Sequence, residues 1–182
     1  MNIYFDIFKL RVKASLSFYR KRDTWTKGVM NRTKEGRYVF FLDYDLMKMD
    51  YIEGELEHLQ LMYDLGDIHV FQSSQKGFHA VSFAKLTAKE YVEILNNSSC
   101  DSAFKNLPRF SSYRNWVLRW DTKGKTPRPV YLKTINAKTK REQSSAHHKF
   151  YSVMFPEMDA KLINPDKVFE LTGISYATGG NV

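Results

Sequence analysis

The sequence predicts an α+β domain, with a central mixed or antiparallel sheet flanked by helices. Short β-prone runs end at turn residues and alternate with segments whose apolar residues recur at helical spacing. The chain has 182 residues, 43% of them hydrophobic and 15% aromatic, which fits one domain with a substantial core. We therefore expect a single domain over residues 1–182.

The first expected strand covers residues 37–42, a continuous β-prone run typical of a strand buried on both faces. Asp43 and Asp45 follow directly at its end. A helix is expected next, with Asp50 as its N-cap and Gly66 as its stop. Its apolar positions recur at helical spacing: Ile52, Leu56, Leu59 and Tyr63.

The middle of the chain predicts a hairpin. Residues 68–72 form one strand, residues 73–77 turn the chain, and residues 78–83 return as the next strand. Thr87 then begins a helix that continues through Leu95. A polar turn therefore lies between two apolar strands.

Two further strands are expected at residues 116–120 and 129–133, joined by a turn with a glycine and a proline over residues 121–128. Helical character resumes over residues 141–151. A basic N-terminal arm and a C-terminal helical extension complete the expected domain.

Composition excludes several classes of protein. No stretch approaches roughly 18 uninterrupted apolar residues, so no transmembrane helix is expected. The N-terminus is interrupted by charged residues and has no signal-peptide apolar region. The single cysteine, Cys100, excludes an internal disulfide framework and a Cys-rich zinc site. We expect a soluble, cytoplasmic protein without zinc and without a membrane partner.

The net charge of +8 is unevenly distributed along the chain. Residues 105–149 contain twelve basic and two acidic residues, and residues 9–37 contain ten basic and two acidic residues. Between them, residues 43–67 contain eight acids and one lysine. A basic surface around a small acidic centre suits a polyanion held near metal ions, whereas the alternative is an ordinary solvated surface.

Asp43 and Asp45 are the strongest candidates for chemistry. Positions i and i+2 of a strand project from the same face, so the two carboxylates point the same way. Their Cβ atoms would lie about 6–7 Å apart, where ionised carboxylates repel each other. A hard divalent cation such as Mg²⁺ or Mn²⁺ relieves that repulsion through oxygen ligands, and the alternative is a solvated strand end.

The polar turn of residues 73–79 is the second candidate. Gly77 permits a close backbone approach, while Ser74, its serine neighbour and Lys76 supply donors for phosphate oxygens. His79 opens the next strand, where its ring can donate to a phosphate or a sugar hydroxyl. Without a ligand, the same residues form an ordinary hairpin turn with a packed histidine.

Taken in this order, the two motifs resemble the catalytic core of the archaeo-eukaryotic primases and primase-polymerases. Residues 40–45 match the first motif of that family, an apolar strand with Asp-x-Asp or Asp-x-Glu. Residues 73–79 match the second motif, a small-residue turn with a basic residue followed by Gly-x-His. The resemblance covers about residues 37–133 and implies a primase-polymerase catalytic fold.

The third family motif is an apolar residue followed by one acid, and two positions fit it. Asp101 follows Cys100, and Asp121 follows Trp120. We prefer Asp101, because a strand bearing Arg and Lys often follows this acid in the family, and Arg119 with Lys123 fits that pattern. Asp121 remains the alternative.

The resemblance implies a nucleotidyltransferase, a DNA primase or primase-polymerase active in replication. Two Mg²⁺ or Mn²⁺ ions would activate a 3′-hydroxyl and stabilise the displacement of pyrophosphate. The residues implied to hold these ions are Asp43, Asp45 and Asp101.

The same resemblance implies an NTP or dNTP site. Ser74, Lys76 and His79 would bind the triphosphate, with Arg119 and Lys123 as further phosphate contacts. The basic segments would hold a single-stranded DNA template, on whose bases an exposed aromatic residue such as Tyr113 or Trp116 stacks; core packing is the stronger expectation for Trp116. A helicase or another replication protein would be a further partner, and the chain would be a minimal catalytic core from a plasmid or a virus.

A different class of protein remains open, a non-catalytic basic domain that binds single-stranded nucleic acid. It predicts that Asp43 and Asp45 are dispensable and that binding does not depend on divalent metal. A rolling-circle relaxase is disfavoured, because His69 lacks the second histidine that such a site requires.

Overall fold

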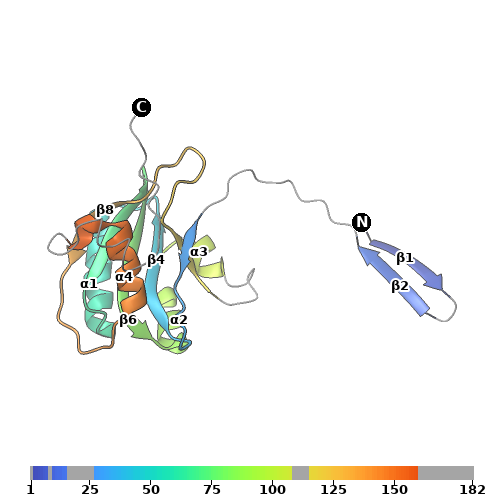
Figure 1. The fold of residues 1–182 in the computed structure, drawn as a ribbon, viewed down its shortest axis with the longest axis horizontal. Helices are drawn as coiled ribbons and strands as arrows, with labels where there is room; N and C mark the ends of the chain where they lie inside the picture. Colours follow the sequence, from blue (N-terminus) through green and yellow to red (C-terminus); the bar gives the residue numbers. More distant parts are fainter. Residues whose placement is uncertain (1, 8–9, 16–26, 108–114, 160–182) are drawn as a thin grey trace.

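The computed structural model describes residues 2–7, 10–15, 27–107 and 115–159 (Figure 1). It confirms the predicted α+β class, since helices pack on antiparallel sheets. The elements in chain order are β1 Asn2–Ile7, β2 Leu10–Ser15, β3 Gly28–Met30, β4 Tyr38–Asp45, α1 Met49–Tyr63, β5 Ile68–Ser74, β6 Gly77–Leu86, α2 Ala88–Asn97, α3 Ser102–Asn106, β7 Val117–Arg119, β8 Val130–Ile135, α4 Ser145–Met154 and the 3-10 helix η2 Pro156–Asp159.

The central sheet has four strands in the order β4-β6-β5-β8, and every neighbouring pair is antiparallel. β5 and β6 form the predicted hairpin, whose turn is tighter than expected because only Gln75 and Lys76 separate the strands. β7 pairs with β3 in a separate two-stranded sheet instead of extending the central one. β1 and β2, which the sequence did not predict, pair with each other.

Two layers of helix enclose the central sheet. Phe41 of β4 and Phe71 of β5 contact the ring of Tyr151 of α4, with ring centroids 5.9 and 5.6 Å apart, which places α4 over one face (Figure 1). On the other face, Tyr44 donates a hydrogen bond to Glu55 of α1. Tyr91 of α2 donates to the Phe41 carbonyl oxygen at 2.6 Å. β4 is therefore covered on both sides, as its continuous apolar sequence predicts.

The ends of α1 differ from the prediction. Its N-cap is Lys48, not Asp50, because Met49 packs against the core and the helix starts two residues earlier than expected; Asp50 lies in the first turn. The helix ends before Asp64, which adopts the left-handed conformation with φ 49°, and the expected stop at Gly66 lies two residues further on. Aspartate tolerates this conformation because its short polar side chain forms local hydrogen bonds.

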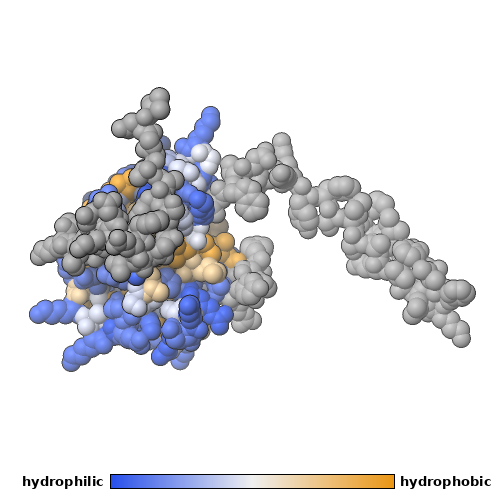
Figure 2. Space-filling model, in the orientation of Figure 1, coloured by the Kyte–Doolittle hydropathy of each residue, from blue (hydrophilic) through white to orange (hydrophobic). Residues whose placement is uncertain are grey.

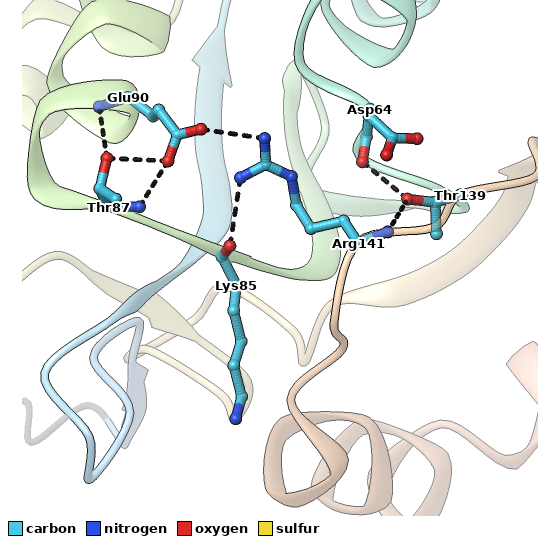
Figure 3. A network of polar contacts seen from close by, with 6 residues as sticks. All are labelled: Asp64, Lys85, Thr87, Glu90, Thr139 and Arg141. Carbon is cyan, nitrogen blue, oxygen red and sulfur yellow. Dashed lines mark hydrogen bonds and ion pairs between the residues drawn. The ribbon is translucent and has the colours of Figure 1, made fainter.

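α2 begins as predicted. Thr87 is its N-cap and forms a capping box with Glu90, whose Oε2 atom accepts from the Thr87 backbone N–H at 2.7 Å. The other carboxylate oxygen of Glu90 accepts from Arg141 at 2.9 Å, and Arg141 also donates to the Lys85 carbonyl oxygen (Figure 3). Through Thr139, the same network reaches the Asp64 carbonyl oxygen at the end of α1. These contacts tie the segment before α4 to α1 and α2.

The surface view is largely hydrophilic over the described body, with an apolar patch in the region of β3 (Figure 2). Met30 and Val117 form a cross-strand pair between β3 and β7, and both are exposed. In the described part of the chain, no helix is long and apolar enough to cross a membrane.

Candidate active site

The two predicted motifs meet in a cleft of about 390 Å³ on the α4 side of the sheet, at the end of β4. Its walls come from the five strands β3, β4, β5, β6 and β7 and from the loop that follows β7. The lining residues are Gly28, Asp43, Asp45, Ser73, Ser74, His79, Val117, Leu118, Arg119, Lys123 and Thr126. A larger cavity of about 760 Å³, beside β8 and α4, contains none of the predicted site residues.

The register of β4 against β6 brings the two motifs together. Asp43 is paired with His79, and Asp45 is paired with Gly77. The His79 Nε2 and Asp43 Oδ1 atoms are 3.5 Å apart. Both aspartates lie within the last three residues of β4, whereas the sequence placed them just beyond the strand. They are held on one face by the pleat, since only the buried Tyr44 separates them.

Burial and like charge make Asp43 an unusual carboxyl group. Burial, followed by the carboxylates of Asp45 and Asp101, raises its pKa to about 7, against the opposing effect of Arg119 and Lys123. A cation bound between the carboxylates would remove the repulsion that contributes to this shift.

His79 is neutral in this environment. Its burial, followed by the positive charge of Arg119, lowers its pKa to about 3. The contact with Asp43 is therefore not an ion pair at neutral pH. A neutral imidazole carries one N–H donor, so His79 can donate one hydrogen bond into the cleft but adds no positive charge.

Arg119 is fixed in the wall of the cleft by backbone carbonyl groups. Its Nη1 atom donates to the carbonyl oxygens of Asp121 at 2.7 Å and Pro127 at 2.6 Å, and its Nη2 atom donates to the Ser73 carbonyl oxygen. Desolvation lowers its pKa, while the charge of Asp43 raises it. The guanidinium therefore supplies a positioned positive charge beside Asp43 and also connects β7 to the β5–β6 hairpin.

The two candidates for the third acid lie in different surroundings. Asp101 adjoins Asp43, since its backbone N–H donates to the Asp43 carbonyl oxygen at 2.7 Å. Its carboxylate caps α3 by accepting from the Phe104 N–H at 2.9 Å. Asp121 instead pairs with Lys27 at 3.4 Å. Of the two, Asp101 is the acid whose charge acts on Asp43, although it is not among the residues that line the cleft.

Four of the five predicted phosphate contacts line the cleft: Ser74, His79, Arg119 and Lys123. The fifth, Lys76, lies exposed in the β5–β6 turn at its edge. Lys123 is placed by a small turn in which its backbone exchanges two hydrogen bonds with Thr126. Sequence reasoning missed Gly28 and Thr126, because neither belongs to a motif; only the pairing of β3 with β7 and the folding of the loop bring them there.

Gly77 leaves room for oxygen atoms at the base of the cleft. A Cβ atom at this position would lie 2.7 Å from Ser74 Oγ and 2.9 Å from both Ser73 Oγ and Asp45 Oδ1. Any larger residue would displace these side chains, so the packing requires glycine here. Among the described residues, no group of three or more His, Cys, Asp and Glu side chains is arranged to hold a metal ion.

Trp116 and Tyr113 are the two aromatic residues that the sequence offers for base stacking. Trp116 is 7% exposed and contacts Tyr91 with ring centroids 4.9 Å apart, so it belongs to the core and is not available for base stacking. Tyr113, the other stacking candidate, lies outside the described residues. His147, which follows Ser145 and Ala146 in α4, is buried, and its Nε2 atom contacts the Met30 carbonyl oxygen at 2.9 Å.

Comparison of the chain with protein-family models, with curated proteins and with solved structures finds no match. The cleft itself combines two carboxylates, a neutral histidine, two serine hydroxyls and two cations. Carboxylates suit hard metal ions, while the cations and hydroxyls suit phosphate groups. Function has to be inferred from this combination.

Proposed function

We propose that the chain is a nucleotidyltransferase, a DNA primase or primase-polymerase that copies single-stranded DNA during replication. The observation that carries the proposal is the antiparallel pairing of β4 with β6, which sets Asp43 opposite His79 and Asp45 opposite Gly77 at one cleft. Two motifs that are 28 to 36 positions apart in the sequence thereby form one candidate site.

The acidic groups fit the Mg²⁺ or Mn²⁺ ions that such chemistry uses. Asp43 and Asp45 share one face, Asp101 lies close enough to raise the pKa of Asp43, and no described basic side chain forms an ion pair with Asp45 or Asp101. Substrate phosphates and water would complete the coordination, since Mg²⁺ usually takes only one or two carboxylates from a protein. Bound metal supplies charge neutralisation and activation of the attacking hydroxyl.

The basic and neutral residues would hold the nucleotide. Lys123 and Arg119 attract the triphosphate to the wall opposite β4, and Lys76 reaches it from the turn. His79, being neutral, donates a hydrogen bond to a phosphate or sugar oxygen without competing with metal for Asp43. Ser74 lies beside them in the cleft.

The basic segments would hold the template and, in replication, a helicase or another partner would deliver it. Of the twelve basic residues in 105–149, Arg109 and Arg114 lie outside the described residues. Arg119 and Lys123 lie in the cleft itself, so the template surface would continue from the nucleotide site.

Incorporation of labelled nucleotide on a single-stranded template, with Mg²⁺ or Mn²⁺, tests the proposal. Asp43→Ala with Asp45→Ala should abolish incorporation, because no other pair of carboxylates lines this cleft within the described residues. Asp50→Asn is the matched control, since it removes an exposed acid from the same acidic segment. Normal incorporation by the double variant would overturn the proposal, and template binding without any incorporation by the wild type would favour the non-catalytic alternative.

A further inference from the structure

Three side-chain oxygen atoms cluster around Gly77. Asp45 Oδ1, Ser73 Oγ and Ser74 Oγ all lie 2.7–2.9 Å from the point where a Cβ atom of residue 77 would be. We call these three oxygens, arranged around the Gly77 backbone, the Gly77 cradle. They come from the ends of two strands, β4 and β5, on either side of β6.

The oxygens of the cradle are free to bind a ligand. Among the described residues, none of the three takes part in a hydrogen bond or an ion pair with another side chain. Ser73 is nevertheless only 6% exposed, and the cradle opens into the cleft that Ser73, Ser74 and Asp45 line. Because the three oxygens line the cleft, a ligand there can bind them without first breaking a hydrogen bond to another described side chain.

Both sides of the cradle are fixed by backbone contacts. The Leu46 N–H donates to the Lys76 carbonyl oxygen at 2.8 Å, which joins the end of β4 to the β5–β6 turn. Leu46 has a φ of 60°, an unfavourable conformation for leucine that is typical of functional sites. On the other side, Arg119 donates to the Ser73 carbonyl oxygen. The oxygens are therefore positioned before a ligand arrives.

We propose that the Gly77 cradle holds a hard divalent cation, Mg²⁺ or Mn²⁺, in the absence of nucleotide, with the Ser73 and Ser74 hydroxyl oxygens as ligands beside the Asp45 carboxylate. A phosphate in direct contact with these hydroxyls would face the negative charge of Asp45, whereas a cation satisfies all three oxygens at once. Water completes the coordination sphere, as is usual for Mg²⁺. The inference deepens the proposed function, because it assigns the serines to metal binding instead of direct phosphate binding.

Titration of the nucleotide-free protein with Mn²⁺, followed by the electron paramagnetic resonance signal of free Mn²⁺, tests the cradle. Ser73→Ala with Ser74→Ala should weaken binding by about 10- to 100-fold, the range typical for loss of groups that support a metal site. Gly77→Ala should do the same by placing a methyl group among the oxygens and displacing them; the backbone there does not have a positive φ, so the change adds no backbone strain. Ser145→Ala, an exposed serine of α4, should bind Mn²⁺ like the wild type.

Melting curves without metal check the fold of each variant. If the double serine variant is destabilised, Ser74→Ala decides the question alone, because Ser74 is the more exposed of the two serines. Wild-type Mn²⁺ affinity in a folded serine variant would overturn the inference.

The outcomes for the cradle and for the proposed function are separable. Unchanged Mn²⁺ affinity with a raised KM for nucleotide in the serine variants would reject the cradle and retain the nucleotidyltransferase. Serine-dependent Mn²⁺ binding in a wild-type protein that incorporates no nucleotide would retain the cradle and reject the nucleotidyltransferase.

Discussion

The hydroxyl of Tyr44 donates a 2.8 Å hydrogen bond to Glu55 Oε1, and thereby ties the residue between Asp43 and Asp45 to helix α1. The Glu55 carboxylate also accepts from the Ser99 backbone N–H at 3.0 Å and from the Ser99 hydroxyl. Ser99 is two residues before Asp101. One carboxylate on the far face of the sheet therefore connects β4 with the segment that carries Asp101.

Glu55→Ala should destabilise the protein by about 1–3 kcal/mol, because it leaves the hydroxyl of the fully buried Tyr44 without its acceptor. Urea unfolding measures the effect, with the exposed Glu57→Ala on the same helix as the control. If Glu55 positions the acids, Glu55→Gln should retain more activity than Glu55→Ala. Equal nucleotide incorporation by the wild type, Glu55→Gln and Glu55→Ala would show that the hydrogen bonds of Glu55 do not position the acids of the cleft.

Asp43→Asn should stabilise the metal-free protein at alkaline pH. The folded-state pKa of Asp43 is raised to about 7, so the stability that this group contributes is fully present below its unfolded pKa of about 4 and is lost as the pH rises through 7. We expect a gain of about 2 kcal/mol at pH 8 and little change at pH 4, a modest value because the side chain is 28% exposed.

Urea unfolding in the presence of a chelator measures this difference, with Asp50→Asn as the control. The pH dependence of the wild-type stability alone does not isolate Asp43, because the pKa shift of His79 changes the stability in the opposite direction. Its folded-state pKa is lowered to about 3, so its contribution is present above about pH 6.5 and is lost as the pH falls towards 3. A pH-independent difference between Asp43→Asn and the wild type would contradict the raised pKa of Asp43.

His79→Ala should weaken use of the nucleotide far more than binding of the template. A hydrogen bond to a charged phosphate contributes about 1.5–3 kcal/mol, so KM should rise or kcat should fall by roughly 10- to 150-fold. Because His79 is 6% exposed, the variant should also melt at a lower temperature. Steady-state kinetics against nucleotide concentration are decisive: a destabilised variant with an unchanged KM and kcat would exclude His79 from the site.

The network of Glu90 and Arg141 should make the fold sensitive to acid (Figure 3). The hydrogen bond from Arg141, followed by those from Thr87, lowers the pKa of Glu90 to about 2. The stability that Glu90 contributes to the fold is present above its unfolded pKa of about 4.3 and is lost as the pH falls through 2. Arg141→Ala should therefore cost about 1 kcal/mol at pH 7 and less at pH 3, as measured by thermal unfolding. The same loss at both pH values would show that Arg141 acts through packing alone.

Binding of single-stranded DNA should weaken steeply with salt and show little sequence preference. Each phosphate neutralised by Lys or Arg releases counterions, so log K falls linearly with log salt, with a slope of about −0.7 per contact on a single strand. Lys123→Ala should reduce that slope by less than about one unit, because it removes one contact from the cleft. Fluorescence anisotropy across a salt series measures the slope, and an affinity that does not change with salt would reject a polyanion site.

The sequence by itself determined the local elements. The uninterrupted apolar run of β4 requires burial on both faces, and the Thr87 capping box and the Gly77 turn depend on residues close to one another in the chain. Strand alternation also placed Asp43 and Asp45 on one face, because side chains of a strand point to opposite faces in turn. These features are local, so they can be predicted without knowing the fold.

Only the tertiary structure decided which of these elements meet at the cleft. The pairing of Asp43 with His79 depends on the register of β4 against β6, and a shift of one residue would move His79 to the opposite face. Which of the two candidate acids adjoins Asp43 depends on contacts across the fold: the Asp101 N–H donates to the Asp43 carbonyl oxygen, whereas Asp121 pairs with Lys27. The burial that moves the pKa values of Asp43 and His79 in opposite directions likewise arises from residues distant in the sequence, since desolvation depends on everything that surrounds a group in space.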